Sequence, residues 1–164
     1  MKDYIEIKLS QNKIALIDKE DFIRVSQFTW FFSKKNKTGL GYAQRSQHIK
    51  LGFKSYKTKT IYLHHFILGI TTGEVDHKNG DPLDCRKDNL RVGTHQMNLC
   101  NRASRIGSTS KYVGVHFHKL TGKWRVQIKV EGKKKSLGLF VNPEEAKAAR
   151  DDFIMKNNLE WYRR

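Results

Sequence analysis

Three short alternating segments near the C-terminal end, separated by tight-turn sequences, constrain the fold of this chain more than any other feature. "YVGVHFH" (112–118), "KWRVQIKV" (123–130) and "KKSLGLF" (134–140) are joined by "KLTG" and "EG", which are typical of hairpin turns. "NPEEAKAARDDFIMKNNL" (142–159) follows, with an asparagine cap, a proline in the first helical position and two glutamates in the first turn. The pattern predicts a three-stranded antiparallel sheet packed on one helix.

The N-terminal part of the chain indicates further short strands and short helices. We predict strands at 4–9, 13–18, 28–32 and 41–46, and helices within 18–28, 59–70 and 92–104. The Gly- and Ser-rich stretch 105–111 reads as a linker. We therefore expect an α+β protein with one domain over 1–106 and a second over 107–164.

The charge of the chain points to a polyanionic partner. Lys and Arg number 32 against 16 Asp and Glu, a net charge of +16 that is spread along the whole sequence. Such a surplus repels itself, and binding to a polyanion relieves the repulsion. A basic but functionally neutral surface is the alternative. No segment approaches the ~18 apolar residues of a membrane span, so nucleic acid is favoured over a membrane.

The N-terminal segment and the cysteines indicate in which cellular compartment we expect the protein. The start "MKDYIEIKLSQNK" lacks the apolar stretch of a signal peptide. Cys85 and Cys100 stand 15 positions apart and neither belongs to a CxxC pair, so we expect two free thiols and no structural zinc. Together with the basic charge, these features predict a cytoplasmic, DNA-associated protein with no membrane partner.

The stretch "VDHKNGDPLDCRKDNL" (75–90) gathers four aspartates, a histidine and two asparagines in a basic chain. Hydrolysis of a phosphodiester needs an activated water and a cation near the scissile phosphate. Mg²⁺ takes oxygen ligands, and a neutral histidine is a suitable general base near pH 7. Asp76 beside His77 offers one ligand and one base, on opposite sides of the chain if the pair ends a strand. The other three aspartates fit turns and caps better than metal ligation.

The order of "LHHFI", "VDHKNGDPLDCRKDNLRV" and "THQMN" within 60–101 resembles the HNH signature of phage and intron homing endonucleases, a ββα-metal motif. The resemblance implies that Asp76 and Asn98 ligate the metal and that His77 takes a proton from the attacking water. It implies that Asn89 holds the loop through backbone hydrogen bonds. His64 matches the first histidine of the family's His-Arg pair and joins the catalytic group.

The same resemblance supplies further candidates. His65 stands where the family carries arginine, and with Arg91 it is a candidate DNA contact. Asn79-Gly80 would make the turn between the two strands of the motif. Many HNH proteins add cysteine pairs for zinc, which this chain lacks.

The landmarks "YVGV", "GKWRVQI", "GKKKSLGLF" and "EEAKAARD" make residues 110–154 similar to an APETALA/ethylene-response-factor-type DNA-binding domain. In that family a three-stranded sheet lies in the major groove and the helix packs behind it. Period-two alternation in 123–130 places the apolar side chains toward the helix and a polar row outward. The candidate DNA contacts on the outward face are His116, His118, Arg125, Gln127, Lys129, Lys134 and Ser136.

The sequence therefore predicts a homing-type HNH endonuclease that acts on double-stranded DNA with Mg²⁺, or Mn²⁺, as its metal. One chain carries one such centre, so we expect a monomeric nickase, with a dimer as the route to a double-strand break. The alternative from another class is a non-catalytic, sequence-specific DNA-binding regulator with a degenerate nuclease centre. RNA binding has less support, because the aromatic ribonucleoprotein signature is missing.

Overall fold

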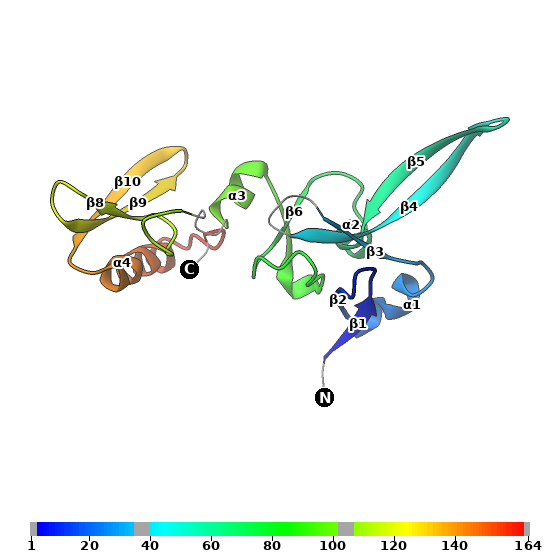
Figure 1. The fold of residues 1–164 in the computed structure, drawn as a ribbon, viewed down its shortest axis with the longest axis horizontal. Coiled ribbons are helices and arrows are strands. Elements are labelled where there is room, and N and C mark those ends of the chain that lie inside the picture. Colours follow the sequence, from blue (N-terminus) through cyan, green and yellow to red (C-terminus); the bar gives the residue numbers. More distant parts are fainter. Residues whose placement is uncertain (1–2, 35–39, 102–106, 163–164) are drawn as a thin grey trace. The chain divides into compact units, whose positions relative to one another are not determined.

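The computed structural model describes residues 3–34, 40–101 and 107–162 and divides into two compact units, residues 1–95 and 96–164 (Figure 1). Each unit has its own hydrophobic core. The described residues form several small antiparallel sheets and a few helices, a mixed α and β architecture. The predicted domain boundary at 106/107 borders residues 102–106, which lie outside the described part.

The first unit begins with a hairpin and a three-stranded sheet. The hairpin is followed by one turn of 3-10 helix, η1, and by the helix α1, and the sheet has the order β3-β4-β5. The bounds are β1 Tyr4–Lys8, β2 Ile14–Asp18, η1 Lys19–Asp21, α1 Phe22–Val25, β3 Phe31–Lys34, β4 Gly41–Gly52 and β5 Ser55–Tyr62.

A helix and a second hairpin complete this unit and lead into the next. The strands β6 and β7 pair antiparallel, and the long segment between them contains a second 3-10 turn, η2. The bounds are α2 Leu63–Leu68, β6 Glu74–His77, η2 Lys87–Asn89, β7 Leu90–Gly93 and α3 His95–Cys100. Along the chain these elements follow one another in the order β6, β7, α3, and their arrangement as a ββα-metal motif stays a prediction.

The core of the first unit lies between the β1-β2 hairpin, the β3-β4-β5 sheet and α2. Ala15 and Ile17 of β2 are fully buried because alternate residues of a strand point to the same face. They share one cluster with Trp30, Ala43 and residues of α2. The helix α2 is therefore held from several sides, which fixes the direction of the side chains that it carries.

A glycine and an arginine cap the C-terminal end of α2. Gly69 follows the helix with φ of 68°, a left-handed conformation that costs glycine little. Arg24 of α1 donates from Nη1 to the carbonyl oxygen of Phe66 at 3.2 Å and from Nη2 to that of Ile67. A cation bonded to the last carbonyls of a helix also complements the helix dipole.

Several sequence-based boundaries differ from the structure. The helix predicted at 59–70 is wrong in its first four residues, because 59–62 belong to β5 and pair with β4. The strand predicted at 28–32 begins later, at Phe31, and residues 92–93 of the predicted helix at 92–104 lie in β7. Residues 102–104 of that helix lie outside the described part. These shifts arise where a cross-strand partner, distant in sequence, decides the local conformation.

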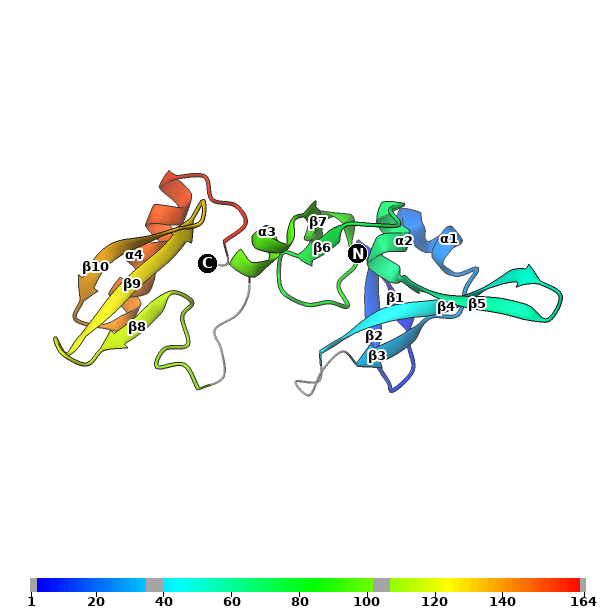
Figure 2. The same cartoon turned by 90° about the horizontal axis from the view of Figure 1, so that it is seen from above.

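The second unit contains the sheet β10-β9-β8 and the helix α4 (Figure 2). Its bounds are β8 Val115–His118, β9 Lys123–Val130, β10 Lys133–Phe140 and α4 Pro143–Lys156. Val115, Val126 and Ala146 form the buried centre between sheet and helix. The side chain of Asn142 accepts the backbone N–H of Glu145 at 2.8 Å and caps α4. The predicted three strands and helix are confirmed, with a later start for the first strand.

None of the helices in the described residues combines the length and the apolar character that crossing a bilayer requires.

Candidate active site

Asp76 and His77 lie at the end of β6 and point to opposite faces of the β6–β7 hairpin. Asp76 is directly opposite Arg91 in the ladder. The guanidinium of Arg91 donates from Nε at 2.8 Å and from Nη2 at 2.7 Å to Oδ2 of Asp76. Both side chains are mostly buried, so this ion pair holds the Asp76 carboxylate in one orientation.

His77 faces the interior, where only 6% of the residue is exposed. Its ring lies 5.2 Å from the ring of His64 at an interplanar angle of 87°, and 6.2 Å from the ring of Tyr42. Burial lowers the pKa of His77 to about 4, against the weaker opposite effects of the carboxylates of Asp76, Asp81 and Asp84. The imidazole is therefore neutral at pH 7, the form that accepts a proton.

The ring of His64 in α2 is surrounded by rings from β4, from β5 and, through His77, from β6. The ring of Tyr62 in β5 stacks on that of His64 at 5.5 Å, and the ring of Tyr42 in β4 meets it edge-on at 5.3 Å. The neighbouring His65 is less buried, and its ring lies 5.9 Å from that of Tyr62. Partial burial lowers the pKa of His65, partly offset by a hydrogen bond to the backbone of Gly73.

Asn89 links both ends of the segment 78–89, which we call the motif loop. Its Nδ2 donates to the carbonyl oxygen of Asp84 at 2.7 Å, and its Oδ1 accepts the N–H of Asn79 at 3.0 Å. Lys78 N–H donates to the carbonyl oxygen of Asn89 at 2.9 Å. These bonds fix the chain immediately after His77.

Asp84 organises the middle of the motif loop as an internal ion pair. Its carboxylate accepts from Nε and Nη2 of Arg86 at 2.8 and 2.7 Å and from Nδ2 of Asn79 at 2.8 Å. The hydrogen bonds from Arg86 are the largest cause that lowers the pKa of Asp84, against the opposing effect of burial. The Asp84 carboxylate is thus engaged by hydrogen bonds from within the motif loop. Arg86, which makes most of them, was not predicted from the sequence to have a role.

The strand β2 holds the motif loop from outside, an arrangement that we call the β2 strap. Leu16 donates its N–H to the carbonyl oxygen of Leu83 at 2.9 Å and accepts the N–H of Cys85 at 2.8 Å. Two residues further along each segment, Oδ2 of Asp18 accepts the N–H of Lys87 at 2.7 Å. A short parallel bridge therefore ties the N-terminal hairpin to the motif.

This geometry lies within the part of the chain that resembles a known family. Residues 69–100 match the family model of an HNH endonuclease. The match covers β6, the motif loop, β7 and α3, and it supports a DNA-cleaving hydrolase of the HNH type. No curated protein and no solved structure matches the chain.

The HNH segment contributes to a second group of potential metal ligands. His64, His77 and Cys85 are buried, and one ligand atom from each lies within 4.8 Å of the others. Two imidazoles and a thiol suit a transition ion such as Zn²⁺ better than Mg²⁺, which prefers oxygen. Burial raises the pKa of the Cys85 thiol, so the uncharged thiol is its resting form. A search for cysteine pairs in the sequence does not detect such a mixed group.

The oxygen donors of the HNH segment fit a hard divalent ion. Asp76 presents a carboxylate that Arg91 orients, and HNH nucleases use divalent metals. Asn98 lies on α3 within the second unit, and its ligation of a metal stays a prediction. His95, the first residue of α3, contacts Oε1 of Glu74 through Nδ1 at 2.8 Å. This contact ties the start of α3 to the start of β6.

The polar residues predicted to contact DNA share one face of the β10-β9-β8 sheet. Directly opposite residues in a ladder lie on the same face. The register pairs His116 with Arg125, His118 with Lys123, Gln127 with Ser136 and Lys129 with Lys134. Arg91, which with His65 was predicted to contact DNA from the first unit, is paired with Asp76, and its contact with DNA stays a prediction.

Proposed function

We propose that this protein is a metal-dependent endonuclease that hydrolyses a phosphodiester in double-stranded DNA. The observation that carries the proposal is the adjacency of Asp76 and a neutral His77 at the end of β6, inside the segment that matches an HNH endonuclease. A carboxylate for a hard cation and an imidazole for a proton are the two groups that the reaction needs from the protein.

Each residue near the centre has a distinct proposed role. Asp76 would hold Mg²⁺ or Mn²⁺, with Asn98 as the second ligand that the sequence resemblance implies, and the bound metal would stabilise negative charge on the phosphate. His77 takes a proton from water as the water attacks phosphorus. The bond to O3′ breaks, which leaves a 3′-hydroxyl and a 5′-phosphate. Asn89 keeps the motif loop closed behind His77 through its two backbone hydrogen bonds.

Two residues support this centre from the sides. The ring of His64 packs at right angles to that of His77 and limits its rotation, a positioning role. His65, one residue further along α2, is more exposed and is the candidate for a phosphate contact.

The polar face of the second unit is proposed to bind the duplex. It presents Arg125, Lys129 and Lys134 with hydrogen-bonding side chains between them, as a sheet in the major groove requires. The sequence resemblance to an ethylene-response-factor-type domain supports this assignment. With one nuclease centre per chain, a site-directed nick of the homing type is the expected product.

A non-catalytic DNA-binding regulator is the second candidate. Two observations favour it: only 6% of His77 is exposed, and the Asp76 carboxylate is already paired with Arg91. A degenerate centre would keep such a packed arrangement, whereas a nuclease must open it to water and metal.

Conversion of supercoiled plasmid to the nicked form separates the two candidates. Wild type is assayed in Mg²⁺, Mn²⁺ and EDTA beside His77→Gln and Asp76→Asn, with His95→Gln as a matched control on an exposed histidine of the same segment. The nuclease predicts metal-dependent nicking that His77→Gln and Asp76→Asn abolish and His95→Gln preserves, with gel-shift binding unchanged. Binding without nicking, on plasmid libraries with randomised inserts as well, would support the regulator.

A further inference from the structure

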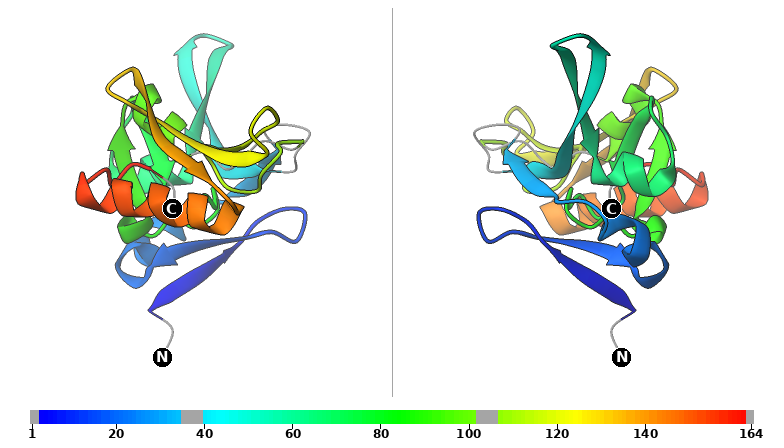
Figure 3. Two further views of the ribbon diagram at one scale, coloured as in Figure 1. Left: turned by 90° about the vertical axis from the view of Figure 1, so that its left-hand side faces the viewer. Right: turned by 90° about the vertical axis from the view of Figure 1, so that its right-hand side faces the viewer.

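The strands β4 and β5 continue beyond the core of the first unit as a two-stranded arm. The ladder runs from Gln44 opposite Tyr62 to Gly52 opposite Ser55. From 46 to 60 every residue is exposed, on both faces of the ribbon. We call residues 46–60 the β4–β5 arm, and its projection from the sheet is clear in Figure 1 and Figure 3. An isolated two-stranded ribbon is marginally stable by itself, so a partner would be expected to cover it.

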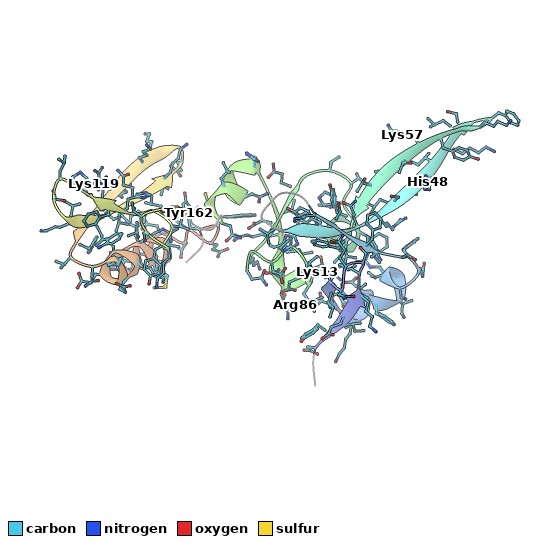
Figure 4. All side chains as sticks on the ribbon, in the orientation of Figure 1. Lys13, His48, Lys57, Arg86, Lys119 and Tyr162 are labelled. Carbon is cyan, nitrogen blue, oxygen red and sulfur yellow. The ribbon has the colours of Figure 1, made fainter. Side chains whose placement is uncertain are left out.

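The charge of the arm has one sign. Residues 46–60 contain no Asp or Glu, and they carry four lysines, Lys50, Lys54, Lys57 and Lys59. Lys57 and Lys59 lie opposite Ile49 and Gln47 on one face, whereas Lys50 lies opposite Tyr56 on the other. His48, paired with Thr58, adds a polar group beside Lys57 along the ribbon (Figure 4). Cations on both faces suit a groove that has phosphates on both walls.

The end of the arm is apolar and open to solvent. Phe53 is 90% exposed, Leu51 64% and Tyr56 62%. The ammonium group of Lys54 lies 5.6 Å from the centre of the Phe53 ring. Apolar side chains that stand at the tip of a basic element are the groups that enter a base step and unstack it.

We propose that the β4–β5 arm enters a groove of duplex DNA, with its lysines on the phosphates and Phe53 inserted at a base step. The inference rests on the proposed function in one respect, the choice of DNA as partner. An anionic membrane would also attract lysines and an apolar tip. A flat membrane surface would contact only the tip of the arm, however. The lysines extend along the ribbon as far as Lys59, which fits a groove that encloses the arm. Insertion of Phe53 unwinds the duplex, and no bond is made or broken.

The first test measures how binding depends on salt. The full chain in EDTA binds a random-sequence duplex, and the triple variant Lys50→Gln, Lys57→Gln, Lys59→Gln is compared with wild type. The slope of log K against log salt should fall by about 2.7, since each phosphate contact contributes about 0.9. The matched control replaces Lys8, Lys13 and Lys19 by Gln, three exposed lysines of the same unit. An equal fall in both triple variants, or no fall in the arm variant, overturns the proposal.

The second test detects insertion without needing a cleavage site. Closed circular plasmid is relaxed by a metal-independent topoisomerase in the presence of the protein and EDTA, and the linking number is read after removal of the protein. Wild type should lower the linking number, and Phe53→Ser should abolish that change and weaken binding by about tenfold. Leu120→Ser, on an equally exposed apolar residue of the β8–β9 turn, should behave as wild type.

The outcomes distinguish the arm from the nuclease. If the wild type nicks no plasmid in Mg²⁺ or Mn²⁺ but still lowers the linking number, the proposed catalysis is rejected and the arm proposal stands. An unchanged linking number with wild type, or with Phe53→Ser equal to wild type, overturns insertion even if nicking is confirmed. Binding to phosphatidylserine vesicles that Phe53→Ser removes, while DNA binding persists, assigns the arm to a membrane instead. All the substituted side chains are exposed, and equal thermal unfolding curves check that the fold is retained.

Discussion

His77 is the residue whose surroundings most affect its chemistry. Its folded pKa of about 4 lies below the unfolded value near 6.5, so the unfolded chain binds the additional proton between these pH values. His77 should therefore contribute its full stabilisation above pH 6.5. The free energy of unfolding should fall by about 3 kcal/mol as the pH drops to 4. Urea unfolding of the metal-free protein across this range measures the effect.

The variant His77→Gln isolates that contribution. The stability of this variant should change much less than that of the wild type between pH 6.5 and 4. The other histidines are present in both proteins, so the difference between the two profiles reports His77. Asp84, whose pKa Arg86 lowers, loses its contribution only at more acid pH. A wild-type profile that His77→Gln fails to flatten would contradict the buried position of this imidazole.

The side chain of Asn89 makes two hydrogen bonds to the backbone of the motif loop in a mostly buried position. Asn89→Ala removes both and should lower the free energy of unfolding by about 2–3 kcal/mol. Asn89→Asp keeps the acceptor for the N–H of Asn79 but sets a carboxylate oxygen against the carbonyl oxygen of Asp84 at a buried position, so it should be at least as unstable as Asn89→Ala. Equal stability of all three proteins in chemical denaturation would argue against the bonds described here.

Residues that belong to a sequence motif could be recognised from the sequence, whereas the residues that contact them in the fold could not. Asp76, His77 and Asn89 stand out because their order is typical of an HNH segment. The pairing of Asp76 with Arg91 depends on the ladder register, and the approach of Cys85 to the two histidines depends on the fold of the motif loop. Neither contact follows from a spacing along the chain.

The helix α2 illustrates how one element depends on another for its orientation. Arg24 bonds to its last carbonyls and to the buried carboxylate of Asp21. Arg24→Met should lower the free energy of unfolding by about 2 kcal/mol or more, because it leaves Asp21 without this partner and the carbonyls without a donor. Thermal unfolding followed by circular dichroism measures the loss.

The double variant Arg24→Met, Asp21→Asn is the control for the buried charge. It should recover part of the loss, since an amide is easier to bury than a carboxylate. If it is no more stable than Arg24→Met, the bonds to α2 alone account for the effect. Nicking by either variant then reports whether the orientation of His64 matters to the reaction.

Elements with local signals were predicted more accurately than those with distant partners. The helix α4 carries its cap, its proline and its first-turn acids within a few residues, and it was placed correctly. The strand β5 has the composition "SYKTKTIY" with weak periodicity, and it exists because β4 pairs with it. Its outer half therefore escaped prediction, and its inner half was assigned to a helix.

At the scale of the whole molecule, binding and cleavage should respond to different substitutions. Replacement of Arg125, Lys129 and Lys134 by Gln removes three cations from the polar face of the second unit. The salt slope of binding should fall by about 2.7, and nicking at limiting protein should fall with affinity. At saturating protein the nicking rate should return toward that of wild type.

Substitutions in the centre should give the opposite pattern. Asp76→Asn should bind duplex with an unchanged salt slope and remain inactive at any concentration of protein. A variant of the polar face that stays inactive at saturation would mean that this face does more than hold the duplex.

The β2 strap has a consequence for anyone who would transplant the HNH segment into another protein. A fragment cut at residues 69–100 leaves behind Leu16, which makes two backbone hydrogen bonds to the motif loop, and Asp18, whose carboxylate accepts a third hydrogen bond from the loop. It also leaves behind His64 and the tyrosines packed around it. The smallest portable module is therefore not the recognisable motif but nearly the whole first unit, beginning with its N-terminal hairpin, together with α3.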